Sequence, residues 1–152
     1  MIAREGIFPT FFLSGFECST FIWKDQGRRN LCDETGHAEH VQEDYALLRS
    51  LGIAVAREGI PWPLVDRGAS YDFTCLEPFI DAMNRNQILP IWDLCHYGYP
   101  DDVDPLAPDF AERFRSYAQA AVRAGYIGVA EWLVKGQAVR EAVERPLLED
   151  AA

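Results

Sequence analysis

Short apolar stretches recur at regular intervals along the first 123 residues of the chain. They occupy residues 10–18, 53–56 and 88–95, so that successive stretches begin about 40 residues apart. Short apolar runs that stop abruptly at polar or turn-forming residues are typical of strands buried on both faces. We therefore predict three strands at these positions.

Between these stretches, apolar side chains recur three and four positions apart, which places them on one face of a helix. This spacing predicts helices over residues 40–51, 72–86 and 109–123. Thr74 is a candidate N-cap of the second helix, because Glu77 follows it at the spacing of a capping box. The predicted apolar faces comprise Val41, Tyr45, Leu48 and Leu51, then Leu76, Phe79, Ile80 and Met83, and finally Phe110, Phe114, Tyr117 and Ala121.

Strands that alternate with helices predict an α/β fold in which helices cover a parallel sheet. We assign residues 1–123 to this repeating unit, with residues 19–36 as a long loop. Residues 124–152 are poorly patterned: 126–134 are a candidate fourth strand, and 137–149 a candidate charged helix. The sequence therefore predicts three to four strand–helix units.

Each predicted strand ends in ionisable or aromatic side chains. Glu17 ends the first stretch, Arg57 and Glu58 follow the second, and His96 and Tyr97 follow the third. Parallel α/β sheets place their sites at the C-terminal ends of the strands, so these five are candidate site residues. For Arg57 and Glu58, a salt bridge between the two is the favoured interpretation, because unpaired charges are costly to bury.

Three more side chains can be placed from the same pattern. Trp62 follows the second strand and lies between two prolines, which stiffen the loop. Trp92 is expected to pack between the sheet and the helices. Its neighbour Asp93 then points to the opposite face of the sheet and needs a partner there.

The composition and net charge argue against some classes of binding partner. The chain is 49% hydrophobic and 25% charged, with a formal net charge of −10 and a pI near 4.6. This balance argues against nucleic acids and anionic membranes, because phosphate binding requires clustered Lys and Arg. No stretch has the length of a membrane span, and the N-terminal residues lack the pattern of a signal peptide. We therefore expect a cytoplasmic location.

The pattern of potential ligands predicts neither a metal nor another cofactor. The four cysteines lack the CxxC spacing of structural zinc sites and are expected to be reduced thiols. His37, His40 and Asp44 are near one another at the start of a helix, where solvated capping residues are the favoured interpretation over metal ligands. The cysteines are Cys18, Cys32, Cys75 and Cys95.

Three separated motifs together resemble the retaining glycoside hydrolases built on the (β/α)₈ barrel, especially the β-glucosidase-like family one. The family pattern E-D-x-x-L-[LM]-x-x-L-G is matched in residues 43–52, and R-x-S-x-x-W-P in residues 57–63, with Gly59 in place of Ser. The pattern H-W-D-x-P is matched in residues 96–100, with Tyr97 for Trp and Gly98 for Asp. The resemblance covers about residues 10–123.

The resemblance implies a partial TIM barrel and a role for each candidate residue in binding a saccharide or glycoside. Arg57 would lie beside the nucleophilic carboxylate and keep it ionised. His96 would donate hydrogen bonds to sugar hydroxyls, and Glu17, at a position where the family has a Gln, would accept them. Trp62 and Tyr97 would form the walls of the pocket.

The same resemblance shows that the two catalytic carboxylates of the family are missing from this sequence. Retaining hydrolysis uses two carboxylates, and the family takes its acid/base from an Asn-Glu pair after the fourth strand and its nucleophile from the seventh. No Asn-Glu pair occurs in the sequence, and 152 residues supply three to four of eight units. We therefore expect an incomplete glycoside hydrolase with part of the pocket and neither catalytic carboxylate.

Two alternatives remain open. The chain could be a truncated barrel that binds carbohydrate or self-associates through its open sheet edge, since unpaired edge strands invite pairing. It could also be a small α/β enzyme that uses Glu17, Glu58 and His96 in an unrelated reaction.

Overall fold

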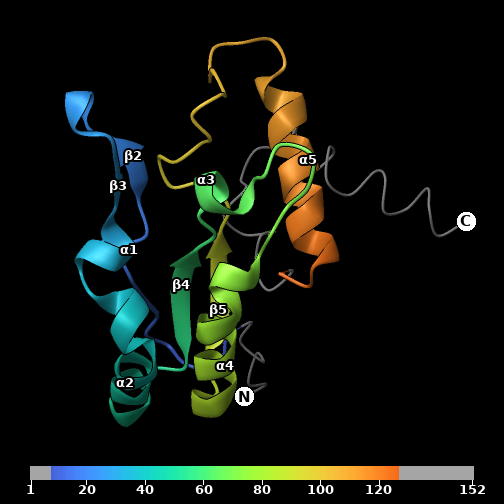
Figure 1. Cartoon of the computed structure of the whole chain (residues 1–152). Coiled ribbons are helices and arrows are strands. Elements are labelled where there is room, and N and C mark those ends of the chain that lie inside the picture. The colour runs from blue at the N-terminus through green and yellow to red at the C-terminus, as the bar shows by residue number, and fades with distance from the viewer. Residues whose placement is uncertain (1–7, 127–152) are drawn as a thin grey trace, which may run out of the picture.

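A three-stranded parallel sheet organises the part of the chain that the structure, a computed structural model, describes, which is residues 8–126. The strands are β1 (Ser14–Gly15), β4 (Val55–Gly59) and β5 (Leu89–Asp93), and β4 lies in the middle. Ala56 pairs with Ser14 on one side and with Pro90 on the other. The predicted α/β fold with a parallel sheet is confirmed (Figure 1).

Helices cover one face of this sheet. Helices α2 (His37–Ser50) and α4 (Glu77–Asn86) pack side by side, and in Figure 1 α4 lies in front of β5 and α2 to the left of β4. Helix α5 (Phe110–Arg123) packs at the C-terminal ends of the strands, where the Tyr117 hydroxyl donates to the carbonyls of Ile60 and Leu94. None of the helices within residues 8–126 has the length and apolarity to cross a membrane.

Alternation along the strands separates two apolar clusters. Ala56 and Trp92 belong to the main core, which they form with the helices. Val55 and Ile91 form a second, small cluster with Phe8 and Leu89 on the opposite face. Because successive side chains of a strand point to opposite faces, the odd-numbered residues of β4 and β5 share this second face. Trp92 is 2% exposed, as expected for a residue between sheet and helices.

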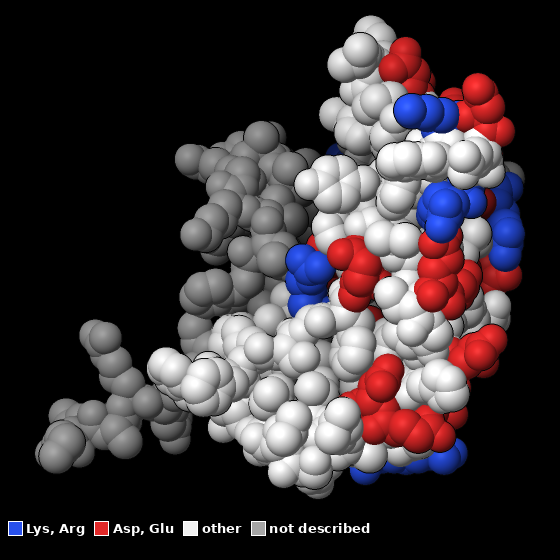
Figure 2. All heavy atoms as spheres, turned by 90° about the vertical axis from the view of Figure 1, so that its left-hand side faces the viewer, with Lys and Arg blue, Asp and Glu red and all other residues white. Residues whose placement is uncertain are grey.

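The segment predicted as a long loop contains regular structure. Strands β2 (Thr20–Ile22) and β3 (Arg28–Asn30) form an antiparallel ribbon, joined by the short helix η1 (Lys24–Gln26) and followed by α1 (Leu31–Glu34). These strands are only three residues long, which is too short for an alternating pattern to reveal them, and β3 consists of polar residues alone. Figure 2 views the side with β2, β3, α1 and α2, where charged side chains of both signs gather on one part of the surface, beside a broad uncharged area.

Several predicted boundaries were wrong. The first strand is two residues long, and Phe11 and Phe12, predicted inside it, are 93% and 70% exposed. Leu51, predicted on the buried face of α2, is 65% exposed, because it lies beyond the last helical turn. Thr74 caps no helix. Its N–H and hydroxyl donate to Asp72, and a 3-10 turn, η2 (Thr74–Leu76), precedes α4.

The predicted Arg57–Glu58 salt bridge is replaced by a buried cluster. Glu58 lies inside β4, is 2% exposed, and accepts hydrogen bonds from the Tyr45 hydroxyl at 2.7 Å and from His37 Nε2 at 3.0 Å. His37 Nδ1 lies 2.6 Å from the Asp44 carboxylate, and the His37 ring stacks on Phe16. The prediction of a solvated His37 was therefore wrong: it joins α2 to β4.

Two carboxylates set the charge of His37. Burial alone lowers the pKa of a histidine, but the hydrogen bonds to Glu58 and Asp44 outweigh it, and the pKa of His37 is raised above its ordinary 6.5. A raised pKa in the folded state means that protonation favours folding. This stabilisation is therefore complete below pH 6.5 and is lost as the pH rises through the raised value.

We predict that the imidazole of His37 titrates above 6.5, as measured by NMR in the folded chain. Glu58→Gln removes the charge of its buried partner and should lower the midpoint of His37. Glu43→Gln, at an exposed position of the same helix, should leave it unchanged. A His37 midpoint at or below 6.5 would contradict this account.

Candidate functional site

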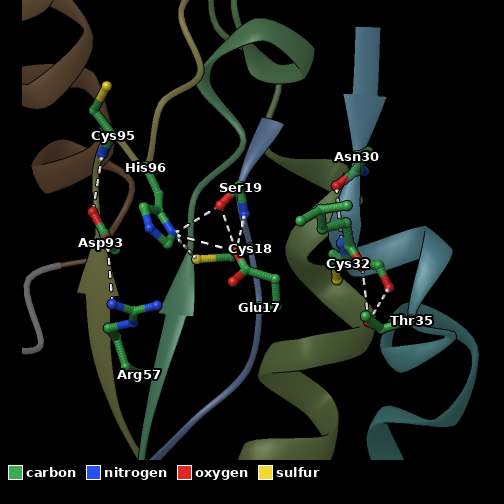
Figure 3. Close-up of polar contacts among 11 residues, drawn as sticks. Glu17, Cys18, Ser19, Asn30, Cys32, Thr35, Arg57, Asp93, Cys95 and His96 are labelled. Atoms are coloured by element: carbon green, nitrogen blue, oxygen red, sulfur yellow. Dashed lines mark hydrogen bonds and ion pairs between the residues drawn. The ribbon is translucent and has the colours of Figure 1, made fainter. Parts of the chain in front are cut away.

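Three polar residues, Glu17, Ser19 and His96, lie close together at the C-terminal ends of β1 and β5. Glu17 and Ser19 follow β1, and His96 follows β5. Glu17 Oε1 accepts from the Ser19 N–H at 2.9 Å and from its hydroxyl, and lies 3.6 Å from His96 Nδ1 (Figure 3). The hydrogen bonds from Ser19 hold the pKa of Glu17 below its ordinary value. Glu17 is therefore an oriented carboxylate beside an imidazole.

Cys18 is a residue of this site that the sequence analysis did not single out. It is 7% exposed, its sulfur lies 3.4 Å from His96 Nδ1, and burial raises the pKa of its thiol to about 12. The side chain lies directly against Gly59: a Cβ on this glycine would come within 2.7 Å of the Cys18 sulfur. The only signal in the sequence is its place after Glu17 at a strand end.

Arg57 and Asp93 lie on the face of the sheet opposite the helices. Arg57 Nη1 is 3.9 Å from Asp93 Oδ2, and the Arg57 side chain is 36% exposed. Asp93 also accepts from the Cys95 N–H at 3.3 Å. The expectation that Asp93 points away from the helices and has a partner there is confirmed. In a closed barrel this face is the interior.

Tyr97 lies at the outer margin of the site. It is 75% exposed, has a positive φ of 59°, and its ring centre is 5.0 Å from that of His96. Behind it is a hollow of ≈ 330 Å³ between the β2–β3 ribbon and the segment after β5. The hollow is lined by Phe21, Ile22, Arg28, Tyr97 and Tyr99.

Trp62 does not lie on a pocket wall. It begins the short helix α3 (Trp62–Val65), is 0% exposed, and stacks on Tyr117 with ring centres 5.0 Å apart. Its Nε1 donates to Asp66, which also pairs with Arg113. This burial corrects the predicted role of Trp62, because a side chain enclosed by core aromatics cannot contact a ligand. The flanking prolines start a helix rather than present the ring.

The C-terminal ends of the strands carry side chains that can bind hydroxyl groups and side chains that can bind cations. Glu17 offers an acceptor, His96 a nitrogen, and Tyr97 an exposed aromatic face. Cys18, Asp93 and His96 offer a sulfur, an oxygen and a nitrogen that all lie within 4.8 Å of one another.

No family model matches the chain, and no curated protein is significantly similar to it in sequence. Solved structures, by contrast, are similar in fold. A family 1 β-glucosidase from Thermotoga maritima has 19% sequence identity and a TM-score of 0.52, over 61% of this chain and 23% of the glucosidase. An aphid myrosinase has 17% identity and a TM-score of 0.57, over 80% of this chain and 34% of the myrosinase.

A third structure, the AHE enzyme from Alicyclobacillus herbarius, has 26% identity and a TM-score of 0.54, over 61% of this chain and 23% of the enzyme. The chain thus spans about a quarter to a third of the length of these proteins. The expected fold is confirmed: the described residues have the fold of part of a TIM barrel, similar to that of the β-glucosidase and the myrosinase. The predictions for residues 127–152 lie outside the described residues.

We predict that Gly59→Ala destabilises the chain by about 1–3 kcal/mol, since its new Cβ would lie 2.5 Å from Cys18 Cβ. Removing the obstructing side chain in Gly59→Ala/Cys18→Gly should recover part of that loss. Urea unfolding of both single variants and the double variant measures the coupling. Additive losses without recovery would show that the two residues do not meet.

Proposed function

We propose that this chain provides the first strand–helix units of a glycoside hydrolase barrel and binds a saccharide or glycoside at the C-terminal ends of its strands. The observation that carries the proposal is the convergence of Glu17 and His96, which come from opposite edges of the sheet and lie 3.6 Å apart. The similarity to glycosidase barrels supports it, since such barrels place their sites at this end.

Each side chain has a role that its surroundings favour. Glu17, kept ionised by Ser19, accepts hydrogen bonds from sugar hydroxyls. His96 forms further hydrogen bonds with the same hydroxyl groups, and the exposed ring of Tyr97 packs against the apolar side of a pyranose. Arg57, paired only loosely with Asp93, is available to a carboxylate or a substrate oxygen.

Bond cleavage requires groups beyond these. Retaining hydrolysis needs an acid/base and a nucleophile some 5 Å apart, and the family positions for both lie on later strands than β5. Glu58, the carboxylate of β4, is buried on the helix side of the sheet, where it accepts hydrogen bonds from His37 and Tyr45. We infer that residues 1–152 hold part of the pocket but do not hydrolyse glycosides by themselves.

This proposal predicts binding of methyl β-glucoside without turnover of a chromogenic aryl β-glucoside. His96→Ala should weaken binding about tenfold, because a lost hydrogen bond to a polar ligand costs about 1–3 kcal/mol. His40→Ala, at an exposed position of α2, is the matched control and should bind as the parent does. Calorimetric titration in the presence of a chelator measures both.

Equal binding by both histidine variants would contradict the site. Turnover of the chromogenic substrate that disappears in Glu17→Gln or Glu58→Gln would instead favour a self-contained enzyme and overturn the inferred lack of hydrolysis.

A second candidate function is self-association through the edge of β1. Within residues 8–126, β1 pairs on one side only, and the residues that lead into it, Phe11, Phe12 and Leu13, are 93%, 70% and 45% exposed. A second copy of the chain could cover this edge and its apolar side chains.

If the edge of β1 associates, light scattering should give a dimer mass that falls to the monomer mass in Phe11→Ser/Phe12→Ser. A monomer in the parent chain at high micromolar concentration would exclude this candidate.

A further inference from the structure

We propose that Cys18, Asp93 and His96 form a binding site for one divalent transition-metal ion. Zn²⁺ is the ion whose preferences suit a thiolate, an imidazole and a carboxylate together, whereas Mg²⁺ and Ca²⁺ prefer oxygen ligands. The proposal goes beyond saccharide binding. It shares only His96 with that function, and it concerns ion binding by the chain alone.

The fold brings the three donors together from separate places in the sequence. Cys18 follows β1, Asp93 ends β5, and His96 follows β5 by three residues. Figure 3 shows the Cys18 sulfur directed toward the His96 ring at the ends of β4 and β5. The parallel pairing of β1 and β5 with β4 brings the two strand ends close together, and Cys18 and His96 lie in the segments that follow these ends.

The spacing of Cys18 and His96 matches that of two zinc ligands. With bonds of 2.0 to 2.3 Å, the donor atoms around a tetrahedral zinc lie roughly 3.3–3.7 Å apart. Cys18 Sγ and His96 Nδ1 are 3.4 Å apart, and all three donor atoms lie within 4.8 Å of one another. The spacings that involve the Asp93 carboxylate oxygen are at most 4.8 Å.

The surroundings favour a built site over a chance meeting of side chains. Cys18 is 7% exposed, and its side chain lies so close to Gly59 that a Cβ on this glycine would come within 2.7 Å of the sulfur. The side chains of His96 and Asp93 are 21% and 18% exposed, so the site is enclosed yet open to solvent on one side. Three protein ligands and an accessible fourth position are typical of zinc sites that also bind water or a substrate.

The positive charge of Arg57 lies close to the site and repels a bound cation. Arg57 Nη1 lies 3.9 Å from Asp93 Oδ2, at the upper limit of an ion pair. The Arg57 side chain is 36% exposed, so it can move toward solvent when a cation takes its place beside Asp93. Glu17, 3.6 Å from His96 Nδ1, adds negative charge on the other side of the site. Arg57→Gln is therefore expected to tighten metal binding.

The experiment is a titration of the full, tag-free chain with Co²⁺, a spectroscopic substitute for Zn²⁺, without saccharide. We expect one ion per chain, a thiolate-to-cobalt charge-transfer band, and displacement of Co²⁺ by Zn²⁺ but not by Ca²⁺. Cys18→Ser should abolish the band, and Asp93→Asn and His96→Gln should weaken binding at least tenfold. Circular dichroism checks that each variant is folded.

The matched controls are Cys75→Ser and His40→Gln, which alter an exposed thiol and an exposed imidazole elsewhere in the chain. Both should bind Co²⁺ as the parent does. If the parent gives no band, or if the band survives in Cys18→Ser, the site is not the one proposed. Because Asp93 and His96 are partly exposed, their variants test the site even if Cys18→Ser does not fold. Saccharide binding in chelator is independent of each of these outcomes.

Discussion

The opposite orientation of Arg57 and Glu58 on β4 is the constraint on which the rest of the structure depends. Glu58 points to the helices and is held by His37 and Tyr45, which ties α2 to the sheet. Arg57 consequently points to the other face, beside Asp93. A shift of one residue in the register of β4 would bury Arg57 among the helices and expose Glu58. The hydrogen bonds of Glu58 to His37 and Tyr45 therefore also determine that Arg57 lies beside Asp93.

Close contacts at glycines allow the segment after β1 to cross the ends of the other strands. Cys18 lies on Gly59, and a Cβ on Gly98 would overlap Thr20, whose N–H donates to the carbonyl of His96. These contacts bring Glu17 and Cys18 to His96. The position at which the resembled family has Ser is therefore a glycine for a steric reason, namely the room that the Cys18 side chain needs.

The repeating pattern was sufficient to predict the sheet, its direction and the helices, because burial of strands and helix faces leaves a periodic trace in the sequence. It was also sufficient to place Trp92 and Asp93 on opposite faces. It failed where contacts are made over long distances: Glu58 has partners 13 and 21 residues away, and Cys18 meets His96 across 78 residues. Trp62 was misplaced because two flanking prolines are compatible with both a rigid loop and the first turn of a helix.

Chemical-shift mapping of the labelled chain with methyl β-glucoside tests the central claim most directly, namely that the C-terminal ends of these strands form part of a saccharide pocket. The predicted result is a saturable set of changes around Glu17, His96 and Tyr97, with none on the exposed faces of α2 and α4. Changes confined to the helices or to the N-terminal ends of β4 and β5, or no saturable change at all, would contradict it.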